Sequence, residues 1–107
     1  MSTDTLAARL ARVRIMAGLT RYHLARLAGL ASPSHVATIE SRSVRTLDSA
    51  TLLSLCDALG CDPRWLASGE GRGPKRGEVS VAVERARMAR TERGGEGRAP
   101  RAGRGTP

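Results

Sequence analysis

The sequence predicts an all-α fold, a compact bundle of five short helices over residues 5–69, on the strength of three observations. The chain of 107 residues contains no Phe, one Tyr and one Trp, so Leu, Ala, Val and Ile must build its core. Such side chains suit close-packed short helices better than a sheet. Apolar residues recur at spacings of three and four, which is the period of a helix. Candidate N-cap residues and glycines also alternate along the chain, and their intervals fit the starts and ends of short helices.

The first two helices are predicted at residues 5–17 and 21–28. Asp4 and Thr20 are placed as their N-caps, since short polar side chains can accept the unpaired amide hydrogens of a first turn. Gly residues after each helix favour the left-handed position that ends it. Arg9 is expected to fall away from the apolar stripe of the first helix. The members of that stripe are Leu6, Leu10, Val13 and Ala17.

The third helix is predicted at residues 33–41, after a tight turn over residues 29–31. Ser32 is expected to cap it and Pro33 to occupy its first position, where the missing N–H is harmless. Val36 and Ile39 are three apart and should face inward. The residues expected on the outer face are Ser34, His35, Thr38 and Ser41.

Asp48 should cap a fourth helix that runs to Leu59, and Asp62 should open a short fifth helix with Pro63 at its start. Glycines after both helices are expected to end them. The inward residues of the two helices are Leu52, Leu55, Cys56, Leu59, Trp65 and Leu66.

The composition changes after Gly69. Residues 70–77 are predicted to be a linker, and residues 78–93 could form a helix with a weak apolar stripe. Residues 94–107 are rich in Gly, Arg, Ala, Pro and Glu, which predicts a basic, largely disordered tail. The weak stripe consists of Val79, Val83, Ala86 and Arg90.

The net charge of +8 is concentrated in the C-terminal third of the chain. Residues 1–70 carry eight Arg and six acids, whereas residues 71–107 carry ten Lys or Arg and four Glu. This balance fits a polyanionic partner. It fits equally a basic solvated tail on a nearly neutral domain.

Cys56 and Cys61 occupy positions suited to apolar residues and are predicted to be buried free thiols in a reducing cytoplasm. No His or Cys pattern predicts a metal site, and no arrangement of nucleophile, base and acid predicts catalysis. We therefore expect a non-enzyme without cofactor or metal. No apolar run is long enough for a membrane span and no signal peptide is visible, so a cytoplasmic, nucleoid-associated protein without membrane contact is expected.

Two short helices joined by a Gly-containing turn, the second with a compact polar face, meet the demands of insertion into a groove about 12 Å wide. The same pattern also fits an ordinary helical hairpin in a small bundle. A family resemblance favours the first interpretation. The segments that carry it are LARVRIMAGLT (10–20), HLARLAGL (23–30), SPSHVATIE (32–40), TLLSLCDALG (51–60) and CDPRWLASGEG (61–71).

In this order and spacing, the segments resemble the Cro/repressor-type family, also called XRE-like or lambda-repressor-like helix-turn-helix proteins. The resemblance covers about residues 5–71 and implies a five-helix DNA-binding domain with residues 33–41 as its recognition helix. Two departures stand out. Arg21 occupies the position where the family has Gln, and the turn at residues 29–32 is one residue longer than usual.

The resemblance implies a set of DNA contacts and one structural ion pair. The pair joins Arg14 of the first helix to Glu40, and its expected role is to lock the recognition helix in place. The expected base contacts are Arg21, Pro33, Ser34, His35 and Thr38. The expected phosphate contacts are Thr20, Ser32, Ser41, Arg42 and Arg45.

The implied function is that of a homodimeric regulator of transcription that binds double-stranded DNA, with a repressor as the expected outcome. One alternative is an antitoxin-type autorepressor of a toxin–antitoxin operon. Another is a protein-interaction adaptor on the same fold. The tail could be a non-specific DNA arm or could contact a protein partner, and residues 78–93 could supply a dimer contact.

Overall fold

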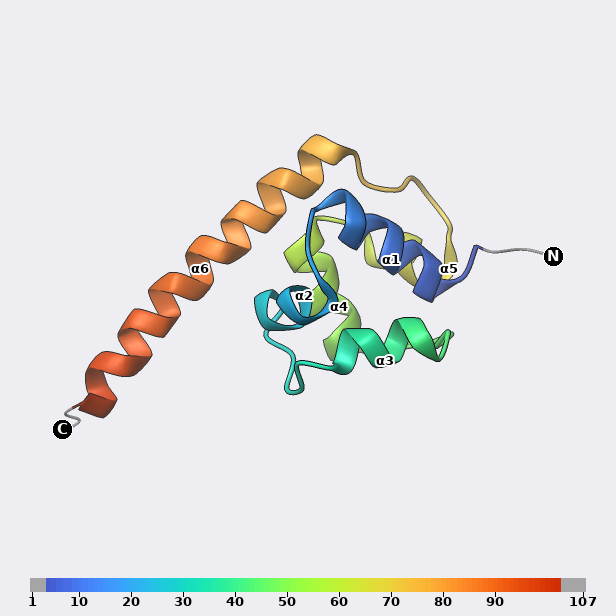
Figure 1. Ribbon diagram of the computed structural model, residues 1–107. Coiled ribbons are helices and arrows are strands. Elements are labelled where there is room, and N and C mark those ends of the chain that lie inside the picture. The colour runs from blue at the N-terminus through green and yellow to red at the C-terminus, as the bar shows by residue number, and fades with distance from the viewer. Residues whose placement is uncertain (1–3, 103–107) are drawn as a thin grey trace.

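The computed structural model describes the backbone of residues 4–102 and the side chains of residues 4–90. Helices form all its regular structure and no described residue lies in a strand, which confirms the all-α prediction. No described helix is both long enough and apolar enough to cross a lipid bilayer. The helices are α1 (Leu6–Met16), α2 (Arg21–Leu27), α3 (His35–Ser41), α4 (Ser49–Leu59), α5 (Pro63–Ser68) and α6 (Arg76–Ala102) (Figure 1).

Side-chain hydrogen bonds confirm the predicted N-caps Thr20 and Asp48 and show that Asp62, at the predicted start of α5, is also a cap. Thr20 Oγ1 accepts from the amide of His23 at 3.0 Å. Asp48 accepts from both the amide and the hydroxyl of Thr51, at 3.1 and 2.7 Å. These bonds hold the pKa of the Asp48 carboxyl below its usual range. Asp62 caps α5 by accepting from the amide of Arg64 at 3.0 Å.

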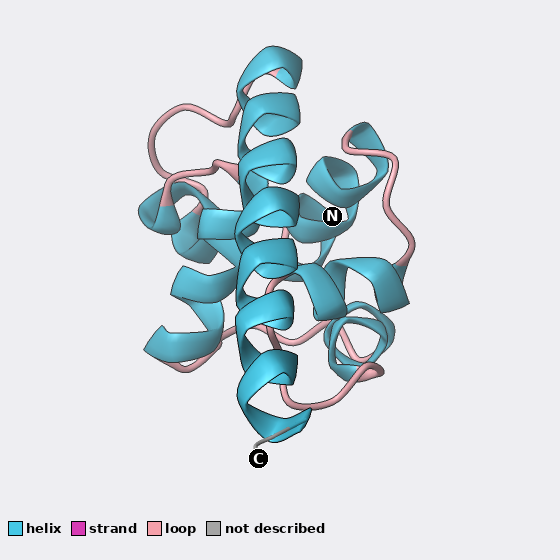
Figure 2. Cartoon of the chain, turned by 90° about the vertical axis from the view of Figure 1, so that its left-hand side faces the viewer, coloured by secondary structure: helices cyan, strands magenta, loops and turns pink. Residues whose placement is uncertain are grey.

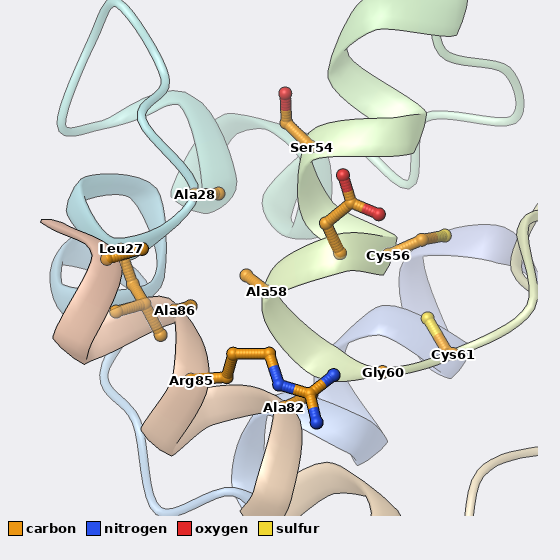
Figure 3. A pocket seen from close by; sticks show the side chains of 12 residues that line it. Leu27, Ala28, Ser54, Cys56, Ala58, Gly60, Cys61, Ala82, Arg85 and Ala86 are labelled. Atoms are coloured by element: carbon orange, nitrogen blue, oxygen red, sulfur yellow. The ribbon is translucent and has the colours of Figure 1, made fainter.

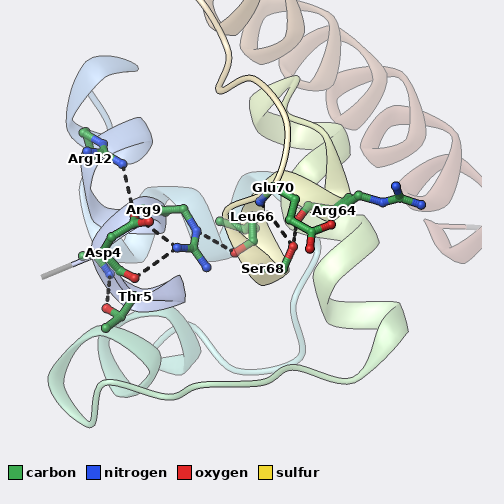
Figure 4. A network of polar contacts seen from close by, with 9 residues as sticks. Asp4, Thr5, Arg9, Arg12, Arg64, Leu66, Ser68 and Glu70 are labelled. Carbon is green, nitrogen blue, oxygen red and sulfur yellow. Dashed lines mark hydrogen bonds and ion pairs between the residues drawn. The ribbon is translucent and has the colours of Figure 1, made fainter. Parts of the chain in front are cut away.

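The start of α1 differs from the prediction. Thr5, not Asp4, caps the helix, because its Oγ1 accepts from the amide of Ala8 at 3.1 Å. Asp4 instead lies 3.1 Å from Nη1 of Arg9. The expectation that Arg9 faces away from the core is also wrong. Arg9 is buried, and its Nε donates to the carbonyl of Leu66 at 3.1 Å, which ties α1 to α5 (Figure 4).

The start of α3 also differs from the prediction. The helix begins at His35, with Ser34 as an N-cap that makes no side-chain capping bond. Ser32 was predicted as the cap, but its carbonyl and hydroxyl oxygens accept from the amides of His35 and Ser34, at 3.1 and 3.3 Å. Such local bonds favour a turn over a helix. Pro33 therefore lies in the turn, and the connection from α2 to α3 is longer than predicted.

The core contains most of the predicted apolar stripe residues, although Ala17 and Leu52 are only partly buried against it. Cys56 and Cys61 are buried free thiols, as predicted. A hydrogen bond to Cys61, together with burial, raises the pKa of the Cys56 thiol, so this thiol stays protonated. The fully buried large side chains are Leu10, Val13, Leu24, Val36, Ile39, Leu55, Leu59, Leu66 and Val79.

Helix α6 packs along the bundle as a sixth helix, mainly against α4 and also against α2 and α1 (Figure 2). It begins at Arg76, inside the segment predicted as a linker. Val79 and Val83 of its weak stripe are buried in the same core as the other helices. The backbone is helical to Ala102. The side chains of 91–107 and the backbone of 103–107 lie outside the described residues, so the predicted disordered tail over 94–107 stays a prediction.

Replacing Gly60 by Ala should loosen the packing of α6 on α4. Gly60 ends α4 with φ of +71°, and a Cβ there would lie 2.7 Å from Cβ of Ala82 and 3.0 Å from the carbonyl oxygen of Glu78. Left-handed strain and overpacking together should lower the free energy of unfolding by about 2–3 kcal/mol, measured by urea denaturation.

Gly29→Ala is the matched control, because Gly29 has φ of +74° but no atom within 4 Å of the added Cβ. This variant should lose only the strain, about 1 kcal/mol. Equal losses from the two variants would contradict the close approach of α6 to Gly60.

Candidate nucleic-acid interface

Helix α3 is held to the bundle from one side only. Val36 and Ile39 are buried, and α3 packs against α1 and α2 (Figure 1). On the opposite side, Thr38 and Ser41 are exposed. The amide of Thr38 donates to the carbonyl of Ser34 at 3.0 Å, so Ser34 lies one helical turn before Thr38. Ser34, Thr38 and Ser41 thus form one exposed hydroxyl strip along α3, which we call the polar strip.

The residues before α3 extend the polar strip. Ser32 and Pro33 are exposed, and the hydroxyls of Ser32 and Ser34 lie 3.0 Å apart. His35 is half-buried at the first position of the helix. All of these side chains are compact, so no long side chain from this segment stands in front of α3.

The ion pair of Arg14 and Glu40 locks α3 against α1. Arg14 Nε and Nη2 donate to the two carboxylate oxygens of Glu40, at 2.7 and 3.2 Å. Arg14 Nη1 also donates to the carbonyl of Leu19 at 2.8 Å. The side chains of Arg14 and Glu40 are only 12% and 7% exposed. Such a bidentate, buried ion pair fixes the orientation of α3 relative to α1 as well as the distance between the two helices.

Arg21 shares the same carboxylate. Its Nε donates to Oε1 of Glu40 at 2.9 Å, while its side chain is 57% exposed. In the free protein, Arg21 therefore connects the start of α2 to the end of α3. The sequence did not predict this contact, because it depends on how the start of α2 and the end of α3 meet in the fold. The base contact expected for Arg21 stays a prediction.

Cationic side chains follow and flank α3. Arg42 is the C-cap of α3, and Arg45 lies in the next loop; both are exposed. Between them, Ser43 adopts φ of +48°, the left-handed region that residues other than Gly rarely enter. Its amide donates to the carbonyl of Glu40 at 3.3 Å, which turns the chain sharply after the helix. No sequence signal marks Ser43 for this role.

Two further exposed residues on α2 escaped the sequence reasoning. Arg26 Nη1 donates to the hydroxyl of Tyr22 at 3.1 Å, and the guanidinium carbon lies 5.7 Å from the centre of the Tyr22 ring. The spacing of four positions on a helix was the available signal. Thr20, expected to contact phosphate, lies exposed at the start of the same helix. Its hydroxyl oxygen accepts the capping bond from His23.

No metal-binding chemistry emerges from the part of the chain that the structure describes. Within residues 4–90, His, Cys, Asp and Glu side chains do not gather in groups of three or more. The chemistry of the α3 region consists instead of hydroxyls, an imidazole and guanidinium groups, which are donors and acceptors suited to bases and phosphates.

A short helix that a helical bundle holds from behind, with its polar side exposed, is the arrangement found in helix-turn-helix DNA-binding proteins. Residues 5–68 match the family described as helix-turn-helix domain. The match covers more than half of the chain, so the chain belongs to this family, consistent with its Cro/repressor-type resemblance. No similar curated protein and no similar solved structure is found. The domain is that of a DNA-binding regulator.

Proposed function

We propose that this protein is a sequence-specific transcriptional regulator, a repressor, that inserts α3 into the major groove of double-stranded DNA. The observation that carries the proposal is the polar strip, which is exposed on a helix whose other side is held by buried Val36 and Ile39. The major groove admits an α-helix, and polar side chains on the outer side of that helix can then contact base edges. The family match supports the same class of partner.

Base reading rests on short side chains. Ser34 and Thr38 hydroxyls can donate to or accept from several base edges, so they discriminate modestly. We infer that DNA shape supplies much of the specificity, with Pro33 and His35 filling the groove beside the hydroxyls. Arg21 uses its Nε on Glu40, and its terminal amino groups are proposed to reach a guanine edge.

Phosphate contacts are proposed on both sides of α3. Arg42 and Arg45 are exposed at its end, where they can clamp one strand. Ser41 is proposed to assist them from the last turn of α3. At the other side, Thr20 and Ser32 lie near the starts of α2 and α3, where backbone amides favour an anion. These contacts would set the register of α3 in the groove.

The regulator is proposed to act as a homodimer on an imperfect palindrome. Two copies related by a two-fold axis place their α3 helices in successive major grooves, so half-sites should lie about 10 base pairs apart or a multiple of this. Binding over a promoter would exclude the polymerase, which gives repression.

Selection from a random duplex pool tests the proposal. The full chain should enrich a two-fold motif, and the enriched duplexes should bind at least about a thousandfold more tightly than random DNA at the same salt concentration. Recovery of unenriched sequences after repeated rounds would reject sequence-specific binding.

Arg42→Ala and Arg45→Ala should each weaken binding to all duplexes and flatten its salt dependence. Each lost phosphate contact should reduce the slope of log K against log salt by about 0.9. Fluorescence anisotropy between 50 and 200 mM salt, roughly the range over which phosphate contacts dominate, measures the slope. Arg64→Ala removes an equal charge from exposed α5 and should leave the slope unchanged. Equal slopes in all three variants would contradict these phosphate contacts.

A further inference from the structure

The side of α6 that points away from the core carries exposed apolar residues. Val81 and Met88 are each 57% exposed, although their neighbours Val79 and Val83 are buried. At about 100° per residue, Val81 and Met88 project roughly opposite to Val79 and lie two turns apart on one side. Figure 2 shows α6 crossing in front of the other helices, with this side uncovered.

Two opposite charges lie between these apolar residues. Glu84 and Arg85 are adjacent in sequence, and both are exposed. Within the described residues, Glu84 makes one long intrahelical contact, 3.8 Å, with Arg87. We call Val81, Glu84, Arg85 and Met88 the outer face of α6. Its order along the helix is apolar, acidic, basic, apolar.

This order is complementary to itself when two copies run antiparallel. A two-fold axis midway between Glu84 and Arg85 sets Val81 level with Met88 of the second copy. The same axis sets Glu84 level with Arg85 of the second copy. Every contact then occurs twice, as the symmetry of a two-fold interface requires. A parallel pairing would set equal charges against each other.

We propose that the outer face of α6 binds a second copy of this chain, antiparallel, to form the homodimer. The proposal rests on the proposed function, because a regulator that binds two half-sites needs two copies of the chain. Opposite charges between the copies select the antiparallel register. The apolar contacts of Val81 and Met88 supply the burial that holds the pair together.

Arg85 stands at the edge of the outer face. It also lines a cavity of about 500 Å³ between α2, α4 and α6, where small residues such as Ala58, Ala82 and Ala86 leave room (Figure 3). The aliphatic part of the Arg85 side chain is flexible. Rotation about its bonds can carry the guanidinium from this cavity to the carboxylate of a facing Glu84.

A second copy on the outer face leaves the DNA side open. In Figure 1, α2 and α4 lie between α6 and α3, so the helix that carries the outer face and the helix that carries the polar strip lie on different sides of the bundle. The contact of one helix face is small, and interfaces below about 1,000 Å² are weak and transient. We therefore expect a concentration-dependent dimer that paired half-sites stabilise.

Charge exchange within the outer face tests the antiparallel register. Glu84→Arg and Arg85→Glu should each set like charges opposite one another and raise the dimer dissociation constant at least about tenfold. The double variant, Glu84→Arg with Arg85→Glu, restores opposite charges and should return to within about threefold of the original value. Sedimentation equilibrium of the full chain without DNA measures all four proteins. A double variant no better than the single variants overturns the proposal.

Val81→Asp tests the apolar contact, with Ser80→Asp as its matched control. Ser80 is exposed on the same turn but roughly 100° away from Val81. Val81→Asp should raise the dimer dissociation constant at least about tenfold, and Ser80→Asp should not change it. Circular dichroism should show the same helix content in both. An equal effect of the two substitutions overturns the proposal.

The two proposals fail in different ways. Val81→Asp should still bind a duplex with one half-site as well as the unmodified chain does, since α3 is unchanged. A chain that stays monomeric up to millimolar concentration but binds selected DNA refutes this interface alone. A chain that dimerises through α6 but selects no DNA refutes the proposed function and leaves the interface standing.

Discussion

Replacing Ser34 and Thr38 together by Glu should abolish specific DNA binding while the helix content stays unchanged. Both positions are exposed, and Ser34 makes no side-chain capping bond to α3, so the bundle can accommodate the longer side chains. In the proposed complex, two carboxylates would enter a groove bordered by phosphates, and the loss of affinity should exceed about a hundredfold. Anisotropy titration of a selected duplex measures the binding, and circular dichroism measures the helix content.

A Glu residue at a position outside the polar strip serves as the control for the effect of charge alone. Ser80→Glu adds a negative charge at an exposed position of α6, a helix that lies away from α3, and should reduce affinity much less than the double variant (Figure 1). Ser34→Ala with Thr38→Ala separates the hydroxyl bonds from the repulsion and should give an intermediate loss. Undiminished binding by the Glu variant would remove the polar strip from the interface.

The second large effect concerns stability. Glu40→Ala should lower the free energy of unfolding by about 3 kcal/mol, because it leaves the nearly buried guanidinium of Arg14 without its carboxylate. That loss is a large part of the roughly 5–15 kcal/mol that stabilises a domain. Urea denaturation followed by circular dichroism measures it.

Two further variants distinguish this mechanism from a general loss of charge. Arg21→Ala removes the exposed partner of the same carboxylate and should cost less than about 1 kcal/mol. Arg14→Met with Glu40→Leu removes both buried charges and should regain most of the stability lost by Glu40→Ala. If Glu40→Ala costs no more than Arg21→Ala, the pair does not hold α3 in place.

Local signals in the sequence were enough to predict most of the bundle. Thr20 and Asp48 cap their helices as expected, because a cap is decided by the bond between a side chain and an amide two or three residues away. Val36 and Ile39 are buried as their spacing indicates.

The features that the sequence did not reveal depend on contacts between distant segments. Arg9 is buried because the carbonyl of Leu66, fifty-seven positions away, accepts its hydrogen bond. Val79 and Val83 enter the core because Gly60 lets α6 approach α4 closely. The stripe of α6 contains only two large apolar residues, and this pattern does not indicate that α6 packs against α4. The start of α3 was misplaced because the local bonds of Ser32 outweigh the helical preference of Pro33 at a first position.

The candidate site was predicted mainly at the level of exposed positions, and the one side-chain contact predicted within the protein was the Arg14–Glu40 ion pair, which the family resemblance implied. Ser34, Thr38 and the arginines after α3 are exposed, as an interface requires. The link from Arg21 to Glu40 could not be predicted, since it depends on where the ends of α2 and α3 meet.

The most direct test of the insertion of α3 into DNA is interference mapping of a selected duplex with 7-deazapurines, which remove only the N7 acceptor in the major groove. Insertion of α3 predicts loss of binding at two clusters of positions, about 10 base pairs apart or a multiple of this, and weaker interference at these clusters for Ser34→Ala with Thr38→Ala, which should retain part of the affinity. Binding that tolerates 7-deazapurines at every position would contradict the insertion of α3 into the major groove.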